Sequence, residues 1–228
     1  MTDDVSIALV LYDRMTALDI IGPLEVLRFL PGARPVLVAD RTGLVPTDVE
    51  ALQLPATATF QEVTAPDVVI VPGGPGTEHV LDGALVEWLR AVHPTTRWTT
   101  SVCSGSMVLA AAGLLEGITA TSHFSVSNLL PLFGVEAVDE RVVVHPEHRI
   151  MTSAGVSAGI DMALHLAEDL SDRLTAQAIQ LVVEYDPRPP YDTGTLRNAS
   201  PEVIARAVEI GRPQGAIPES FDPAAVSR

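Results

Sequence analysis

The chain has 228 residues, of which 47% are hydrophobic, and a formal net charge of −15. This length suits one compact α/β domain and is short for two. A surface with this much negative charge repels phosphate backbones, so we expect no nucleic-acid partner. The apolar runs are shorter than the roughly 18 residues of a membrane span, so we expect no membrane partner. The N-terminus begins acidic rather than basic, and a single cysteine forms no intrachain disulfide, so we expect a cytoplasmic protein.

Apolar runs of strand length alternate with segments of helical periodicity. Residues 5–11 form a continuous apolar run, typical of a parallel strand buried on both faces, whereas 17–30 has helical spacing that Gly22-Pro23 interrupts. This alternation predicts an α/β fold with a flavodoxin-like, doubly wound, mostly parallel sheet. Later strands are expected over 34–40, 44–60 (several short ones), 67–76, 98–103, 118–123 and 136–155 (two), and helices over 83–93, 104–115, 124–133, 157–170, 173–185 and near 201–210.

The composition changes once, after Tyr185, where the chain becomes rich in proline. We therefore predict a single α/β domain over residues 1–190, followed by a C-terminal extension over 191–228. The extension contains one short helix and either packs on the domain or trails from it. It is too short and too acidic to form a helix-turn-helix domain.

Cys103 is the only cysteine, and it lies where a predicted strand passes into a predicted helix. The spacing Ser101-x-Cys103-x-Gly105 resembles that of nucleophile elbows, which present a reactive side chain on a sharp turn. Helix amides that point at the sulfur favour the thiolate. Cys103 is therefore our candidate nucleophile; the alternative is a buried structural cysteine that acts as a small hydrophobic residue.

Two further segments are expected at the carboxyl edge of the predicted sheet. The turn PGGPG can direct the backbone N–H groups of Gly73 and Gly74 at a ligand, as in an oxyanion hole, although it lacks the spacing of a dinucleotide-binding loop. Asp19 has apolar neighbours, and burial there raises its pKa and suits it to proton transfer. The alternative for the glycine turn is a tight turn without a functional role. The alternative for Asp19 is an acid that only complements the helix dipole, and Glu25 is a competing candidate for proton transfer.

Histidines matter because a cysteine nucleophile is often paired with a base. His123 ends a predicted strand near the sheet edge and is a candidate for substrate binding, with a hydrogen-bonded structural role as the alternative. The tripeptide 145–147, His-Pro-Glu, matches the triad of class I glutamine amidotransferases, but its place between two strand-like runs predicts a hairpin turn. The His, Cys, Asp and Glu residues lack metal-ligand spacing, so we expect no metal and no cofactor.

The sequence carries, in this order, the segments ALDIIGPLEVL, VVIVPGGPGT, SVCSGSMVLAAAGLL, TATSHF and TSAGVSAGIDMALHL. Together they resemble the ThiJ/PfpI superfamily, a branch of the class I amidotransferase-like fold, over roughly residues 5–190. LDIIGPLEVL, the serine after Cys103 and QLVVEYDPRPPYDTGT are most similar to isocyanide hydratases and to the sensor domains of AraC-type regulators. Two positions differ from other members of the superfamily and disfavour their activities. Ser104 stands where peptidase-like members have a histidine, and Asp19 stands where glyoxal-detoxifying members have a glutamate.

The resemblance implies an isocyanide hydratase, which converts R–N≡C into an N-formamide. In the expected mechanism the Cys103 thiolate attacks the terminal carbon, and Asp19 supplies a proton to give a thioimidate and then activates water. The amides of Gly73, Gly74 and Ser104 stabilise the developing charge, and the Ser104 hydroxyl also bonds the thiolate.

The resemblance also implies a homodimer, and the small residues that open GVSAGIDMALHL suit a helix contact either between subunits or within one. Two other functions stay open. One is a small-molecule or redox sensor without turnover, because an exposed thiolate oxidises easily. The other is a different cysteine-dependent hydrolase or a glyoxal-detoxifying enzyme. The presence of both Asp19 and Cys103 favours the hydratase, because a sensor tolerates the loss of either.

Overall fold

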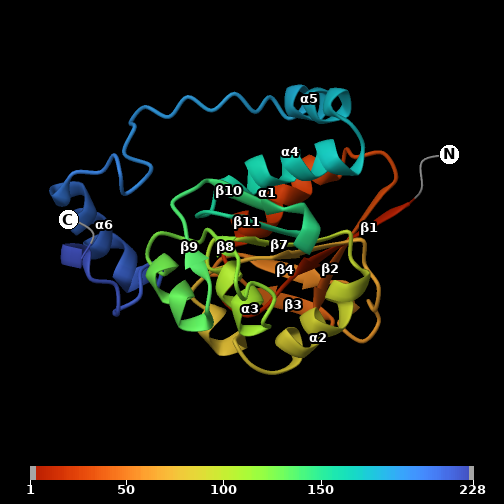
Figure 1. Ribbon diagram of the computed structural model, residues 1–228, viewed down its shortest axis with the longest axis horizontal. Coiled ribbons are helices and arrows are strands. Elements are labelled where there is room, and N and C mark those ends of the chain that lie inside the picture. The colour runs from red at the N-terminus through yellow and green to blue at the C-terminus, as the bar shows by residue number, and fades with distance from the viewer. Residues whose placement is uncertain (1–3, 226–228) are drawn as a thin grey trace.

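The computed structural model describes residues 4–225. A seven-stranded sheet crosses the middle of the molecule in the order β10-β11-β7-β6-β1-β2-β5 (Figure 1). All neighbouring pairs are parallel except β10 with β11. The strands of this sheet are β1 (Val5–Val10), β2 (Ala33–Ala39), β5 (Ala58–Thr59), β6 (Val68–Val71), β7 (Trp98–Val102), β10 (Val142–His145) and β11 (Ile150–Ser153); two small ladders pair β3 (Gly43–Pro46) with β4 (Gln53–Ala56) and β8 (Thr119–Ala120) with β9 (Glu136–Ala137).

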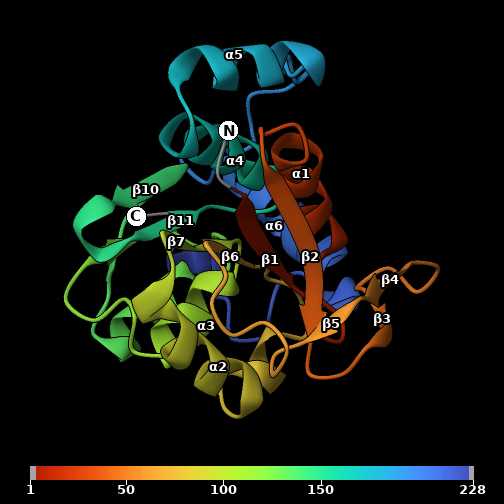
Figure 2. The same ribbon diagram turned by 90° about the vertical axis from the view of Figure 1, so that its right-hand side faces the viewer.

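Helices cover both faces of this sheet, so the predicted doubly wound, mostly parallel architecture is confirmed. Strands β1 and β6 are buried along almost their whole length, which is why their sequences are continuously apolar rather than alternating. On one face lie α1 (Ala17–Leu27) and α4 (Ala158–Leu170), with α5 (Arg173–Val182) packed on the outer side of α4; on the other lie α2 (Ala84–Val92) and α3 (Gly105–Ala111) (Figure 2).

Proline acts differently in two segments that were expected to be helical. Helix α1 continues through Gly22-Pro23, because Pro23 forfeits only one amide hydrogen bond while the helix packs firmly on α4. The expected helix over 124–133 is instead a 3-10 helix, η3 (Ser127–Phe133), with Pro131 inside it. The missing N–H of this proline favours the short 3-10 form over a regular α-helix.

Three expected elements are shorter in the structure. Helix α3 ends at Ala111, two residues before Gly113, whose φ of 77° is left-handed. Helix α5 ends at Val182, shortly before Glu184 at φ 52°. Left-handed residues of this kind commonly terminate helices. The strand expected over 118–123 forms only the two-residue β8.

The C-terminal segment leaves the main body after α5 and returns to it on another side (Figure 1). It runs without regular structure to α6 (Pro201–Gly211). A small second core of Ile204, Ile217 and Phe221 packs there against Phe124 of the domain. No helix within residues 4–225 has the length and apolar character of a membrane span. The remaining 3-10 helices are η1 (Thr77–Val80), η2 (His93–Thr95), η4 (Pro146–His148), η5 (Arg212–Gln214) and η6 (Pro223–Ala225).

Candidate active site

Cys103 occupies the turn between β7 and α3, at the carboxyl edge of the sheet. Its φ of 59° places a non-glycine residue in the left-handed region, as a sharp strand-to-helix elbow requires. The Cys103 amide donates to the carbonyl oxygens of Ser153 and Ala154, both at 3.1 Å, which ties the turn to the end of β11. The side chain is only 6% exposed, and it lines a cavity.

Asp19 lies in the first turn of α1 and is completely buried. Its Oδ2 accepts a 2.8 Å hydrogen bond from the Gly73 amide, whereas its Oδ1 has no hydrogen-bond partner among the described residues. The pKa of Asp19 is raised to about 8, mainly by burial and to a smaller extent by the nearby Asp48 charge, against the Gly73 amide and Cys103, which lower it. The carboxyl therefore holds a proton at neutral pH. Glu25, the competing candidate, is exposed and pairs with Arg28 at 2.7 Å.

The Cys103 thiol differs from its expected state. Burial and the charge of Asp19 raise its pKa, and they outweigh the backbone amides of Ser104 and Val156, which lower it. The resting sulfur is therefore a thiol, not the helix-stabilised thiolate expected from the sequence. The physical reason is that desolvation of a buried charge exceeds the gain from two amide donors.

The glycine turn after β6 is where the sequence placed it, but its amides have partners within the protein. The Gly73 amide holds Asp19, and the Gly74 amide donates a 2.9 Å hydrogen bond to Ser104 Oγ. A Cβ on Gly73 would lie 2.9 Å from the Cβ of Cys103, so only glycine allows this approach, and Gly74 has a φ of 137°. In this structure the two amides orient the site's side chains instead of facing a ligand directly.

A cavity of about 210 Å³ opens beside Cys103 and Ser104. Its wall is mainly apolar, with Met107 and Leu129 from the domain. The C-terminal segment supplies another part of the wall over residues 215–220. The segment thus reaches the site, a point that the sequence left open.

His123 also lines this cavity. Its Nδ1 lies 2.7 Å from the Ser125 hydroxyl, and burial lowers its pKa to about 4. The ring is therefore neutral at pH 7 and a weak base. The expected place of His123 at the sheet edge agrees with the structure, while its role in substrate binding stays a prediction.

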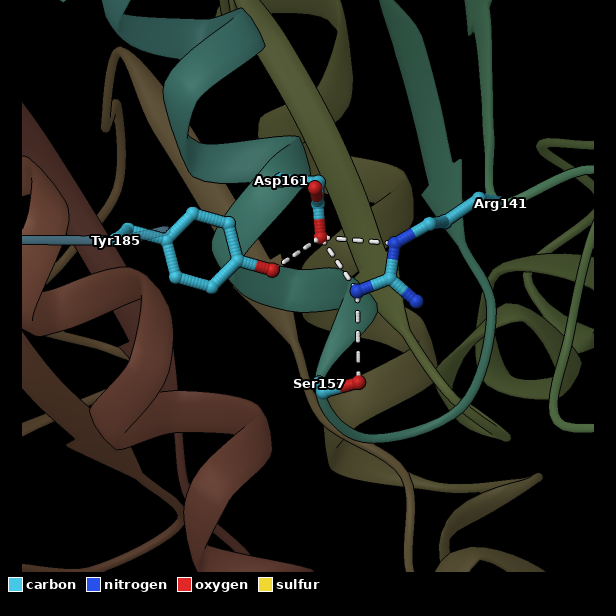
Figure 3. Close-up of polar contacts among 4 residues, drawn as sticks. All are labelled: Arg141, Ser157, Asp161 and Tyr185. Atoms are coloured by element: carbon cyan, nitrogen blue, oxygen red, sulfur yellow. Dashed lines mark hydrogen bonds and ion pairs between the residues drawn. The ribbon is translucent and has the colours of Figure 1, made fainter. Parts of the chain in front are cut away.

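A polar cluster fixes the beginning of the C-terminal segment to α4 (Figure 3). The Tyr185 hydroxyl donates to Asp161 Oδ2 at 3.0 Å, and Arg141 donates to the same oxygen through Nε at 2.9 Å and Nη2 at 2.5 Å. Arg141 Nη2 also approaches Ser157 Oγ at 3.4 Å. This cluster sets the point from which the segment crosses towards α6.

The sequence analysis missed four residues near the site, three for their side chains and one for its backbone amide. Tyr12 and Thr77 form a buried hydroxyl chain to Ser104, while Asp48 acts on Asp19 and accepts a 2.7 Å hydrogen bond from a threonine hydroxyl. Val156 directs its amide at Cys103. Tyr12 lies two residues after β1, and Thr77 directly follows the glycine turn after β6. Ligands of such sheets bind beyond the carboxyl ends of the strands, so the sequence could have indicated both residues. Asp48 and Val156 lie in loops, where no sequence pattern points to the site.

The tripeptide His145-Pro146-Glu147 forms a hairpin turn, as expected. It connects the antiparallel strands β10 and β11 through η4, and His145 Nε2 lies 3.0 Å from the Thr119 hydroxyl. Within residues 4–225, no three His, Cys, Asp or Glu side chains converge in a way that could hold a metal ion.

The fold and the elbow together define an α/β protein with a cysteine at the carboxyl edge of a doubly wound sheet. The chain belongs to the DJ-1/PfpI family, whose model matches residues 5–169. It is 41% identical to an isonitrile hydratase from Pseudomonas putida over 203 residues, or 88% of this chain and 87% of that enzyme. It is also 32% identical to the HTH-type transcriptional regulator GbdR of Pseudomonas aeruginosa, over 60% of this chain and 37% of the regulator.

Solved structures agree with this assignment. A crystal structure of a ThiJ/PfpI family protein from Pseudomonas syringae superposes with a TM-score of 0.85 at 32% identity, covering 100% of this chain and 93% of that protein. Drosophila melanogaster DJ-1beta superposes with a TM-score of 0.71 at 23% identity, covering 79% of this chain and 98% of that protein. At that identity the second likeness concerns the fold alone.

Proposed function

We propose that this protein is an isocyanide hydratase, which adds water to R–N≡C to give an N-formamide. One observation carries the proposal: Asp19 is fully buried and protonated, it lies close enough to Cys103 for each group to shift the pKa of the other, and its Oδ1 has no hydrogen-bond partner within the described chain. Such a carboxyl is ready to exchange a proton with an atom bound to the sulfur. The similarity to the Pseudomonas putida isonitrile hydratase supports the same reaction.

The first half of the reaction joins the thiol to the isocyanide. Asp19 gives its proton to the terminal carbon as the Cys103 sulfur bonds to that carbon, and the thiol proton returns to Asp19. The product is a thioimidate, R–N=CH–S–Cys103. The reaction can therefore start from a thiol. Asp19 gives one proton to the carbon and receives one from the sulfur, so its own protonation is unchanged at the end of this half.

The second half hydrolyses the thioimidate. Asp19, which regained a proton in the first half, gives it to the thioimidate nitrogen and, as a carboxylate, takes a proton from the water whose oxygen attacks the thioimidate carbon. It then gives this proton to the departing sulfur and takes the hydroxyl proton of the intermediate as the carbonyl forms. Breakage of the carbon–sulfur bond yields R–NH–CHO and the Cys103 thiol. His123 is not needed as a base. The mainly apolar cavity beside the sulfur suits a compact, uncharged R group.

The test is formamide production from a panel of alkyl and aryl isocyanides. We expect turnover by the wild type and none by Cys103→Ala, with Asp19→Asn slowed roughly 10²- to 10⁴-fold. Glu25→Gln is the matched control, because it neutralises an exposed acid on the same helix. Full turnover by Asp19→Asn contradicts the mechanism. Isocyanide binding without turnover favours a sensing role, consistent with the similarity to a transcriptional regulator.

We also propose that two copies of the chain associate. Helix α5 exposes Leu174 and Leu181 by 74% and 80%, and these two residues lie two turns apart on one side of the helix, where a second copy of the chain could cover them. The small residues of α4 do not contribute, since a Cβ on Gly159 would contact Val102 and Pro23 of the same chain. Light scattering should give a dimer for the wild type and a monomer for Leu174→Glu/Leu181→Glu. A wild-type monomer contradicts this proposal.

A further inference from the structure

The imidazole ring of His123 is held from several sides at the wall of the cavity. The Ser125 hydroxyl lies 2.7 Å from Nδ1, and the Phe124 ring packs against the imidazole with 4.4 Å between the ring centroids. Gly155 contacts the ring edge: a Cβ at this position would lie 2.6 Å from His123 Cδ2, so a larger residue would displace the ring. Nε2, the remaining polar atom of His123, is therefore held in a fixed position.

The contacts of Nδ1 determine which ring nitrogen carries the proton. The Ser125 amide points at Nδ1 with 3.4 Å between the two nitrogens, and an amide can only donate. A proton on Nδ1 would face the amide proton and repel it, so Nδ1 accepts and the ring proton lies on Nε2. The Ser125 hydroxyl then donates to Nδ1 at 2.7 Å rather than to the Ala216 carbonyl at 3.5 Å, which is long for a hydroxyl donor.

This Nε2–H group is a hydrogen-bond donor without an assigned acceptor. The hydrogen bonds of the His123 ring within residues 4–225 involve Nδ1 alone. Polar groups at the wall of a mainly apolar cavity orient a bound ligand. The glycine amides that the sequence suggested for this task are already engaged, since Gly73 holds Asp19 and Gly74 holds Ser104. His123 thus offers the cavity a donor that those two amides do not.

Two neighbouring residues place this donor beside the Cys103 turn. Ser122, directly before His123, donates a 3.1 Å hydrogen bond from its hydroxyl to the Cys103 carbonyl. Ala154, directly before the Gly155 that contacts the ring edge, accepts the Cys103 amide at 3.1 Å. Cys103 and His123 also border the same cavity of about 210 Å³. A compact group bonded to the sulfur therefore comes within reach of Nε2.

We propose that His123 is a catalytic residue of the second half of the reaction, in which Nε2–H donates a hydrogen bond to the oxygen that becomes the formyl oxygen. The inference rests on the proposed function and deepens it by naming a partner for this oxygen. Water addition gives R–NH–CH(OH)–S–Cys103. As Asp19 takes the hydroxyl proton and the carbon–sulfur bond breaks, negative charge develops on the oxygen, and the N–H group stabilises it. His123 keeps its proton throughout, so no bond forms or breaks at the ring.

The first measurement does not depend on turnover. The ¹⁵N NMR shifts of the His123 ring, read through its carbon-bound protons and assigned by their loss in His123→Gln, identify the nitrogen that carries the proton. We expect the Nε2–H form. Titration with N-butylformamide, a product of the proposed reaction, should shift the Nε2 resonance together with the methyl signal of Met107 on the cavity wall. An Nδ1–H form, or an Nε2 resonance that does not move, overturns the proposal.

The second measurement separates the donor from the bulk of the ring. Phenylalanine keeps a ring without an N–H group, whereas the glutamine amide nitrogen takes the place of Nε2. Intact-mass analysis follows the adduct of butyl isocyanide on Cys103, and product analysis follows formamide release. We expect His123→Phe to form the adduct within about threefold of the wild-type rate but to release formamide roughly 10- to 10³-fold more slowly, so that the adduct accumulates. His123→Gln should recover part of this loss.

His148→Phe is the control for the loss of a histidine, because His148 is half exposed on the turn η4. Unchanged formamide release in His123→Phe overturns the proposal, as does equal slowing of both steps, which shows that the ring only shapes the cavity. If His123→Phe does not fold, His123→Gln and the wild-type NMR measurement carry the test. A wild type that makes no formamide but has the Nε2–H form and responds to N-butylformamide refutes only the proposed function. Turnover with an Nδ1–H form refutes only the role of His123.

Discussion

Two regions meet at the cavity, and they are built very differently. The sheet edge with Asp19 and Cys103 belongs to the main core, where backbone hydrogen bonds and burial on both faces of the sheet hold it. The C-terminal wall depends on a second core centred on three residues, Ile204, Ile217 and Phe221. Regions with few buried apolar contacts open at lower free energy than a domain core. The residues of the proposed chemistry thus lie in the rigid sheet edge, whereas the shape of the cavity depends partly on the less stable C-terminal segment.

Loss of the proposed nucleophile, Cys103, tests the rigid side of this comparison with the largest effect. Cys103→Ser should reduce formamide production by roughly a thousandfold or more, because the hydroxyl is a far weaker nucleophile without a strong base. Its thermal unfolding should stay close to that of the wild type. Formamide production by Cys103→Ser within about tenfold of the wild type would show that the sulfur is not the reacting atom.

Deletion of residues 191–228 tests the other side. The domain should still unfold cooperatively, because its core is separate, while kcat/KM for a bulky isocyanide should fall roughly tenfold through loss of the apolar wall. Phe221→Ala should give a smaller decrease in the same direction. If the truncated chain does not fold, the extension is part of the domain and the comparison fails.

Protonation of Asp19 predicts how stability depends on pH. Its pKa is about 8 in the folded protein and roughly 3.9 in an unfolded chain. Between these values the folded protein keeps a proton that the unfolded chain has released, so this residue makes the free energy of unfolding decline as pH rises from about 4 to about 8. Urea titrations of the wild type and Asp19→Asn should show a smaller decline in the variant. Parallel pH dependences would contradict a buried neutral carboxyl.

Asp48 offers the smallest expected effect and refines the electrostatics of the rigid region. Its charge raises the pKa of Asp19, so Asp48→Asn should lower that pKa by less than about one unit. Because Asp19 carries a proton into the first step of the proposed reaction, kcat/KM should fall above about pH 8 in the wild type and at a slightly lower pH in the variant. Asp48→Glu is the control, and an unchanged pH profile in Asp48→Asn would exclude this coupling.

Residue patterns alone were enough to predict the fold and to bring three residues of the candidate site to one edge of the sheet. Continuous apolar runs reveal strands buried on both faces, and parallel strands bring the residues after β1, β6 and β7 to one edge. That rule predicts that Asp19, Gly73 and Cys103 lie in one region, and the contacts among them agree with it. The hairpin at 145–147 was likewise visible, because a proline turn between two strand-like runs has few other outcomes.

Only the tertiary structure decided the protonation states of the site and the part of the cavity wall that the C-terminal segment supplies. Desolvation depends on every atom around a group, so neither the thiol at Cys103 nor the proton on Asp19 could be read from neighbouring residues in the sequence. The Ser104 hydroxyl is connected to that of Tyr12, which lies far away in the sequence, only through Thr77. Sequence periodicity reports burial of an element, whereas hydrogen-bond direction and the return of a distant segment arise from contacts that only the folded chain creates.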